Sequence, residues 1–186
     1  MPDNDSKFIF SVTVKLMHKH EAKIEVRVSL VSVSTSKSKK YGCLKGINSI
    51  PDEDESSKIA IEELKFKVID YQLVSDNEYE IQRAVLNSKG EIVVVIGGTG
   101  ITPKDVTVEA IKPLIKKELE GFGEVFRYES YKEVGVNAIL SRAFAGILSN
   151  RKVIFCLPGS KNAVRLGIGI INKIAVHVVS HALGLR

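Results

Sequence analysis

The chain has 186 residues, of which 44% are hydrophobic and 26% charged, and its formal net charge at pH 7 is +5. This length suits one domain with a full core, and the composition indicates a soluble, globular protein. We expect no apolar segment long enough to span a bilayer. The N-terminal residues lack the basic start and the long apolar stretch of a signal peptide.

Positive charge gathers in one part of the chain, at Lys37, Lys39, Lys40 and Lys45. Such a cluster could attract nucleic acid or an acidic ligand. Tyr41 stands alone among these lysines and makes no aromatic platform for bases, so we favour a solvated loop over a nucleic-acid site. The two cysteines, Cys43 and Cys156, lack metal-ligand spacing, which indicates a reduced, cytoplasmic setting.

The first half of the chain alternates strand and helix patterns. Alternating apolar and polar residues predict strands at residues 8–16 and 25–34. We assign the first strand to an N-terminal extension, residues 1–22, and residues 23–186 to one domain. The further elements expected here are a Ser/Thr/Lys-rich loop at 34–40, a helix at 57–65, a strand at 65–74, a helix at 78–89 and a strand at 92–96.

The second half continues this alternation. Residues 108–119 are predicted to form a helix that Pro113 kinks or breaks. Residues 163–185 stay ambiguous, because their β-branched residues and glycines favour a strand whereas their apolar spacing is helical. The other expected elements are a loop at 121–123, a helix at 136–149, a buried strand at 152–157 and a helix N-cap at Ser160. Together the elements predict an α/β fold, a three-layer αβα sandwich with a mainly parallel sheet.

A glycine-rich turn follows the apolar strand at 92–96. Gly97, Gly98 and Gly100 free the backbone for close approach of a ligand, and a helix follows, so the turn could cradle a phosphate. The Walker A pattern is excluded because Lys104 lacks the glycine before it and the hydroxyl residue after it. The dinucleotide fingerprint is excluded because Pro103 stands where a glycine is needed.

Two carboxylates could serve this turn. Asp105 could hold Mg²⁺ or orient a nucleophile, or it could close a helix cap begun by Thr102; a helix start at Thr107 is a further alternative. Asp76 lies between a strand and a helix, where an N-cap is the commoner role of such a residue. Both lie at the carboxyl ends of predicted parallel strands, the edge where open α/β sheets bind ligands. Two carboxylates beside a phosphate cradle suit a hard cation.

Other polar residues give weaker indications. His177 and His181 are spaced i, i+4 and could face one metal, but packing or an interface is the interpretation we favour. Arg142 could bind a phosphate or a neighbouring carboxylate. We find no Ser-His-Asp or Cys-His arrangement.

Four blocks of sequence, taken in order, resemble the MogA/MoaB family of molybdenum cofactor biosynthesis, which is also the type of domain found in gephyrin. The blocks lie at residues 97–110, 121–127, 138–146 and 157–163. Any one block would be weak, whereas the joint match is specific.

The resemblance implies an αβα domain that assembles as a trimer or a hexamer, and the binding of molybdopterin. Active members transfer adenylyl from ATP to the molybdopterin phosphate with Mg²⁺ and release pyrophosphate. By this resemblance, Asp76 and Asp105 would be catalytic and would hold the Mg²⁺. The implied substrate-binding residues are Ser34, Gly97, Gly98, Thr99, Gly100, Thr107, Glu109, Ser141, Arg142, Pro158, Gly159 and Ser160.

The chain also departs from the family pattern. Val108 replaces a frequent proline, Ser57 replaces a glycine, and Thr35 fits the MoaB-like branch, some of whose members have no established catalytic role. Three functions are therefore weighed. An adenylyltransferase is favoured because both aspartates are present; a non-catalytic molybdopterin carrier or scaffold is the alternative, and a nucleic-acid-binding protein is the least favoured.

Overall fold

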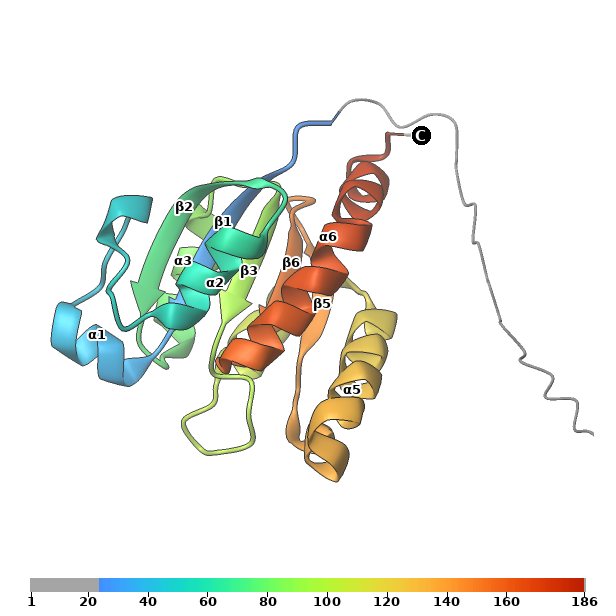
Figure 1. Ribbon diagram of the computed structural model, residues 1–186. Helices are drawn as coiled ribbons and strands as arrows, with labels where there is room; N and C mark the ends of the chain where they lie inside the picture. The colour runs from blue at the N-terminus through green and yellow to red at the C-terminus, as the bar shows by residue number, and fades with distance from the viewer. Residues whose placement is uncertain (1–23, 186) are drawn as a thin grey trace, which may run out of the picture.

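The computed structural model describes residues 24–185 and contains a six-stranded sheet in the order β2-β1-β3-β6-β5-β4 (Figure 1). Strands β2, β1, β3 and β6 run parallel, and β5 and β4 form an antiparallel edge. The strands are β1 (Arg27–Val33), β2 (Lys67–Val74), β3 (Ile92–Ile96), β4 (Ile115–Glu118), β5 (Phe144–Leu148) and β6 (Val153–Leu157). The predicted α/β fold is confirmed; the strand expected at residues 8–16 lies outside the described residues.

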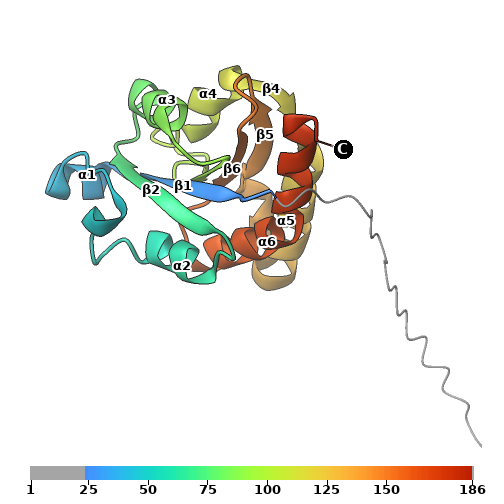
Figure 2. The ribbon, with the colours of Figure 1, turned by 90° about the horizontal axis from the view of Figure 1, so that it is seen from above.

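Helices cover both faces of this sheet. They are α1 (Thr35–Tyr41), α2 (Glu55–Glu63), α3 (Glu78–Asn87), α4 (Thr107–Ile111), α5 (Glu120–Val134) and α6 (Lys161–Leu183), with short 3-10 turns η1 (Ile47–Ser49), η2 (Lys112–Leu114) and η3 (Gly135–Leu140). Helices α2, α5 and α6 lie on one face and α3 and α4 on the other, while α1 lies beyond the β2 edge (Figure 2).

The central strands explain why the core forms here. All five residues of β3 and of β6 are buried, as expected for parallel strands covered on both faces. Alternate residues of β3 face opposite layers, so Val94 packs beneath α2 and α6 and Val93 beneath α3 and α4. These buried strands fix the sheet edge from which the site residues project.

Residues 34–40, predicted as a loop, form helix α1 instead. Ser34 caps its N-terminus by accepting a hydrogen bond from Lys37 N, and Lys39 and Lys40 in the last turn suit the helix dipole. The sequence of α1, TSKSKKY, lacks the apolar stripe that usually indicates a helix, and none of its residues is fully buried.

The predicted interruption of the helix at Pro113 is confirmed, but the residues after it were predicted incorrectly. Pro113 does break the helix, but residues 115–118 then pair with β5 as strand β4. Residues 121–123, predicted as a loop, belong to α5. A Cβ at Gly123 would lie 2.8 Å from the carbonyl oxygen of Ala143, so this glycine allows close packing rather than a turn.

The helix expected at residues 136–149 is replaced by η3 and strand β5. The segment Phe144–Leu148 is buried between β4 and β6, and a short apolar run of this kind does not distinguish a strand from a helix by periodicity. The ambiguous tail is resolved as α6, capped by Ser160 as predicted.

Helix α6 corrects one further expectation. It has 23 residues and is apolar enough that, by length and composition alone, it could cross a membrane. Its inner face, which includes Val164, Ile168 and Ile171, is fully buried against the sheet. We therefore describe it as a core helix with an apolar outer side.

Candidate active site

The carboxyl ends of the parallel strands meet at one edge of the sheet, below the strand arrows in Figure 1. Register places Val33 beside Val74, Ser32 beside Ile96, and Ile96 beside Leu157. The segments that follow these residues contain most of the predicted site residues: Ser34, Asp76, the glycine turn at 97–100, and the turn at 158–160. The topology therefore gathers residues from four separate parts of the chain.

The glycine turn depends on positive backbone angles. Gly97 has φ +107° and Gly98 has φ +65°. A Cβ at Gly98 would lie 2.3 Å from Thr107 Oγ1. Thr107 in turn donates its hydroxyl to the carbonyl oxygen of Gly97 at 2.8 Å and its amide to that of Gly98 at 3.0 Å. The first residue of α4 thus fixes the shape of the turn.

Asp76 lies against this turn. Its Oδ2 accepts hydrogen bonds from the amide and the hydroxyl of Thr35, at 2.8 and 2.6 Å. Its Oδ1 lies 3.2 Å from the position that a Cβ of Gly98 would take. The N-cap interpretation of Asp76 is wrong, because Asn77 caps α3 by accepting from Glu80 N. Asp76 therefore directs one oxygen to α1 and the other toward the glycine turn.

Asp105 lies against the same turn, at Gly100. Its Oδ2 accepts from Thr102 N at 2.9 Å and from Thr102 Oγ1 at 2.6 Å, and a Cβ at Gly100 would lie 2.8 Å from that oxygen. Of the two helix starts considered, Thr107 is confirmed and Thr102 is wrong, because α4 begins at Thr107. Asp105 instead closes a turn in front of the helix and faces Gly100.

Arg142 braces the loop from the end of η3. Its guanidinium donates to the carbonyl oxygens of Gly100, at 2.7 Å, and Asp105, at 3.0 Å, and it pairs with Glu109. Its hydrogen bond holds the pKa of Glu109 below the ordinary value. Ser141 lies beside it, and the Ser141 hydroxyl accepts from Ala143 N. Arg142 is therefore bound both to Glu109 and to the backbone of the turn.

The turn at 158–160 lies against the first glycine of the glycine turn, Gly97. A Cβ at Gly159 would lie 3.5 Å from the Cα of Gly97, and the Gly159 carbonyl accepts a 2.7 Å hydrogen bond from Ser56 Oγ. The adjacent Ser160 caps α6. The first turn of α2 therefore supports the turn that precedes α6.

One hydroxyl in the glycine turn lacks a partner. Thr99 is 1% exposed, and its Oγ1 has no hydrogen-bond partner among residues 24–185. Buried polar groups are nearly always hydrogen-bonded, so an orphan donor here fits a loop built to bind an anionic oxygen. The helix N-terminus of α6 at the same edge adds positive potential.

Sequence reasoning missed a buried polar network next to the site. Asp54, fully buried, accepts from Lys37 Nζ at 2.6 Å and from the hydroxyls of Tyr71 and Ser57 at 2.8 Å. Burial alone would raise the pKa of Asp54, but the Lys37 ammonium and the hydroxyl donors bring it below the ordinary value. Burial and the nearby Asp54 raise the pKa of Tyr71. The one sequence signal was an aspartate in front of a helix.

The lysine cluster is partly explained by carboxylates. Lys37 pairs with Asp54 and Lys40 with Glu53, so two of the four charges are already balanced.

The rings of His177 and His181 meet edge to face, 4.4 Å apart. In residues 24–185 no group of three His, Cys, Asp or Glu side chains could hold a metal.

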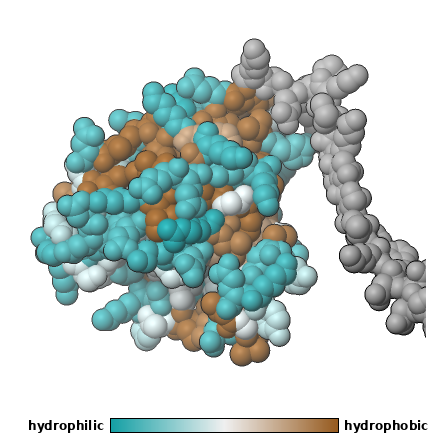
Figure 3. Space-filling model, in the orientation of Figure 1, coloured by the Kyte–Doolittle hydropathy of each residue, from teal (hydrophilic) through white to brown (hydrophobic). Residues whose placement is uncertain are grey.

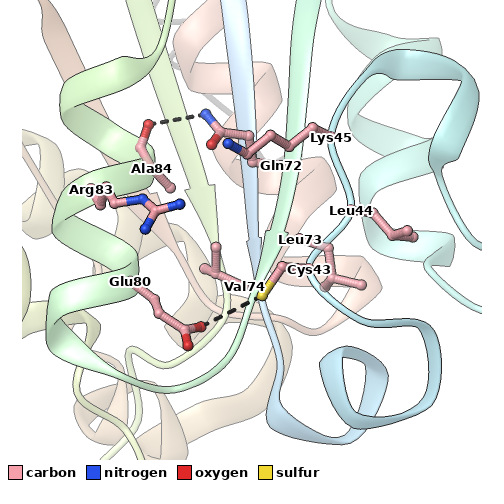
Figure 4. A pocket seen from close by; sticks show the side chains of 9 residues that line it. All are labelled: Cys43, Leu44, Lys45, Gln72, Leu73, Val74, Glu80, Arg83 and Ala84. Carbon is pink, nitrogen blue, oxygen red and sulfur yellow. Dashed lines mark hydrogen bonds between the residues drawn. The ribbon is translucent and has the colours of Figure 1, made fainter.

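Two cavities lie outside the glycine turn and its two aspartates. The first, of about 110 Å³, lies between the segment 43–45, strand β2 and α3 (Figure 4), and Gln72 closes one end through a hydrogen bond to the Ala84 carbonyl. It is small for a ligand pocket. The second, of about 850 Å³, is an apolar groove between α5 and α6 that includes Phe122, Ile170 and Ile174. Neither contains Asp76 or Asp105.

Comparison with known families gives one match that covers most of the chain. Residues 33–177 match the family described as "Probable molybdopterin binding domain". This span includes every predicted site residue.

Curated relatives match over most of their length. A Pyrococcus furiosus protein named molybdopterin adenylyltransferase is 46% identical over 138 residues, which are 70% of this chain and 81% of the relative. A Bacillus cereus protein named molybdenum cofactor biosynthesis protein B is 40% identical over 172 residues, 88% of this chain and 92% of the relative.

Solved structures share the fold. The tungsten cofactor synthesizing protein MoaB from Pyrococcus furiosus superposes with a TM-score of 0.75 at 40% identity, covering 87% of this chain and 99% of that one. A molybdopterin biosynthesis protein from Mycobacterium abscessus superposes with a TM-score of 0.74 at 30% identity, covering 87% and 99%.

Proposed function

The chain belongs to the family of molybdopterin-binding domains, and from this premise we propose that it transfers the adenylyl group of ATP to the phosphate of molybdopterin. The observation that carries the proposal is that Asp76 and Asp105 both lie against the same glycine turn, Asp76 at Gly98 and Asp105 at Gly100. The product would serve the synthesis of a molybdenum or tungsten cofactor, the process named for its relatives.

Adenylyl transfer depends mainly on the positioning of the two reacting phosphates. An oxygen of the pterin phosphate forms a bond to the α-phosphorus of ATP, and the bond from that phosphorus to pyrophosphate breaks. Catalysis of such a transfer rests on alignment of the two phosphates and on stabilisation of their negative charge. The amides of residues 97–100, with the Thr99 hydroxyl, would hold phosphate oxygens.

The residues present also fit Mg²⁺, which prefers one or two carboxylates together with substrate phosphates. Asp76 and Asp105 would hold it, and when bound it would neutralise phosphate charge. Ser34 and the turn at 158–160 would shape the pterin side of the site. Arg142 and Glu109 would act by keeping the glycine turn rigid, because the guanidinium is occupied by two turn carbonyls.

The test is pyrophosphate release from MgATP by the purified protein, with and without molybdopterin. We expect release that depends on the pterin and that falls by a factor of about 100 or more in Asp76→Asn and Asp105→Asn. Lys89→Gln, in the turn before β3, serves as a control variant. Undiminished release in both aspartate variants would contradict these roles.

A carrier function is the second candidate. It is favoured by one observation, that Oδ2 of each aspartate is already hydrogen-bonded to a threonine, as a structural carboxylate would be. A carrier would bind molybdopterin tightly and release no pyrophosphate, so the same assay separates the two functions.

Self-association and compartment are part of the proposal. Helix α5 and η3 expose Tyr128, Tyr131, Val136 and Ile139, and apolar surface also shows between α5 and α6 (Figure 3). Such an area supports a homotrimer or hexamer.

The free thiols Cys43 and Cys156 support a cytoplasmic setting. Ile24 packs against the core, which supports a domain that begins near residue 23 after an N-terminal extension.

A further inference from the structure

Helix α1 lies beside the candidate site, and its apolar contact with the core is made by Tyr41, at its C-terminal end. All seven of its residues keep some exposure, and it lies beyond the edge strand β2 (Figure 2). A helix this short is not stable by itself in water. Polar contacts of Thr35 and Lys37 therefore hold its N-terminal half, the half next to the site.

The first of these contacts is to Asp76. Thr35 donates both its amide and its hydroxyl to Asp76 Oδ2, and Asp76 N donates back to Thr35 Oγ1 at 3.1 Å. This reciprocal arrangement sets the rotation of the carboxylate. It leaves Oδ1 on the side of Gly98.

The second contact lies one half-turn further along α1. Lys37 Nζ reaches 2.6 Å from Asp54 Oδ1, and the Asp54 side chain is fully buried. Asp54 is itself rigid, because it caps α2 through Ser57 N and accepts from the Tyr71 hydroxyl on β2. A buried carboxylate without a cation is costly, so the ammonium is held firmly.

We propose that the Lys37–Asp54 ion pair is a positioning device that fixes α1 and, through Thr35, orients the Asp76 carboxylate for adenylyl transfer. The proposal rests on the proposed function of the site. Lys37 and Asp54 act through another residue and are positioning residues.

Asp54 also connects α1 to the turn at 158–160. It caps the N-terminus of α2, and Ser56 in the first turn of α2 donates a hydrogen bond to the Gly159 carbonyl beside the glycine turn. Asp54 thus couples the α1 side, which holds Asp76, to the turn at 158–160. A shift in the Asp54 contacts would misalign groups that need to be placed to within about 1 Å.

The experiment compares Lys37→Gln and Lys37→Arg with Lys40→Gln in the pterin-dependent pyrophosphate assay. Lys40 lies on the same helix and pairs with the exposed Glu53, so its variant is a matched control. We expect Lys37→Gln to lower kcat by a factor of about 10 to 100 with KM for both substrates within about twofold. Lys37→Arg restores most of kcat, and Lys40→Gln stays near the wild type.

A double variant tests the route through Thr35. If Lys37 acts through the Thr35 contacts with Asp76, Thr35→Val lowers kcat by itself and Lys37→Gln adds little to it. Multiplied effects in Thr35→Val/Lys37→Gln would overturn the proposal, as would an unchanged kcat in a folded Lys37→Gln.

A second readout does not depend on activity. Amide hydrogen exchange in residues 35–41 should accelerate in Lys37→Gln and remain as in the wild type in Lys40→Gln. If exchange is faster in Lys37→Gln but the wild-type protein releases no pyrophosphate, the adenylyl transfer is rejected and the anchoring of α1 is kept. Unchanged exchange would overturn the anchoring itself.

Discussion

At Gly98 the backbone angle and the surrounding atoms both require the absence of a side chain. Its φ is +65°, and a Cβ would collide with the Thr107 hydroxyl that holds the turn. The glycine turn is therefore a built structure, in which Gly98, Thr107 and Asp76 depend on one another. This interdependence gives the first prediction at the scale of single residues.

Gly98→Ala should lower the free energy of unfolding by about 1–3 kcal/mol, because the residue must keep an αL angle and displace Thr107. Pterin-dependent activity should fall with it. Gly169→Ala is the control: nothing lies within 4 Å of its Cβ position and it sits inside α6, so alanine should stabilise by about 0.5–1 kcal/mol. Urea unfolding of both variants checks this. Wild-type stability and activity in Gly98→Ala would contradict the described turn.

Asp54 gives a prediction on pH. Its pKa in the folded protein lies below the ordinary value, so the unfolded chain binds the proton first as pH falls. The stabilisation is therefore present above about pH 4 and is lost as pH falls through the folded pKa. Asp54→Asn, with urea unfolding measured from neutral to acid pH, should flatten this dependence relative to the wild type. An equal slope in the two proteins would show that other groups cause it.

At the scale of elements, the contact between α6 and α2 illustrates how a side chain completes a helix end. Asn172 on α6 donates to the Glu63 carbonyl at 2.8 Å and accepts from Lys65 N at 2.9 Å. Both groups belong to the end of α2, where the helix leaves backbone groups unpaired. The contact lies away from the strand ends.

Asn172→Ala should lower the free energy of unfolding by about 1–2 kcal/mol, since two hydrogen bonds to the backbone are lost. Because the residue lies outside the site, kcat should not change. Glu62→Ala, on the exposed side of α2, is the control and should alter stability by no more than about 0.5 kcal/mol. A loss of kcat without a loss of stability in Asn172→Ala would contradict this assignment.

The elements also show what local sequence could predict. Strands β1, β2, β3 and β6 and helix α3 were predicted because their apolar patterns are local. Strand β4 and strand β5 were missed because their burial depends on pairing with each other and with β6. Helix α1 was missed because ion pairs and hydrogen bonds, rather than an apolar stripe, hold it.

The candidate site follows the same division. Topology placed Asp76 and the glycine turn at one edge in advance, since both follow parallel strands. The contacts of Asp54 with Lys37 and Tyr71 join residues 17 positions away on either side of Asp54, and no local pattern indicates them. The brace formed by Arg142 is likewise visible only in three dimensions.

At the scale of the whole molecule, the apolar surface of α5 and η3 needs an occupant. Ile139 is 75% exposed and Val136 is 68% exposed. The preceding helix, α5, forms one wall of the apolar groove between α5 and α6. The occupant we propose is a second copy of the chain. Exposed apolar area of this kind is uncommon in monomers.

The double variant Val136→Lys/Ile139→Lys should therefore lower the mass of the assembly measured by sedimentation. Leu86→Lys on α3, where the leucine is 52% exposed outside this area, should leave the assembly unchanged. A wild-type protein that sediments as a monomer would contradict the proposed self-association. An unchanged assembly in the double variant would place the contact elsewhere.

The central claim is adenylyl transfer, and the most direct measurement is to follow a radiolabel from ATP in the presence of molybdopterin and Mg²⁺. We expect label at the α-phosphorus to appear on the pterin and label at the γ-phosphorus to leave with pyrophosphate, both abolished in Asp105→Asn. Pterin that binds but acquires no α-label, or that acquires the γ-label, would contradict the account.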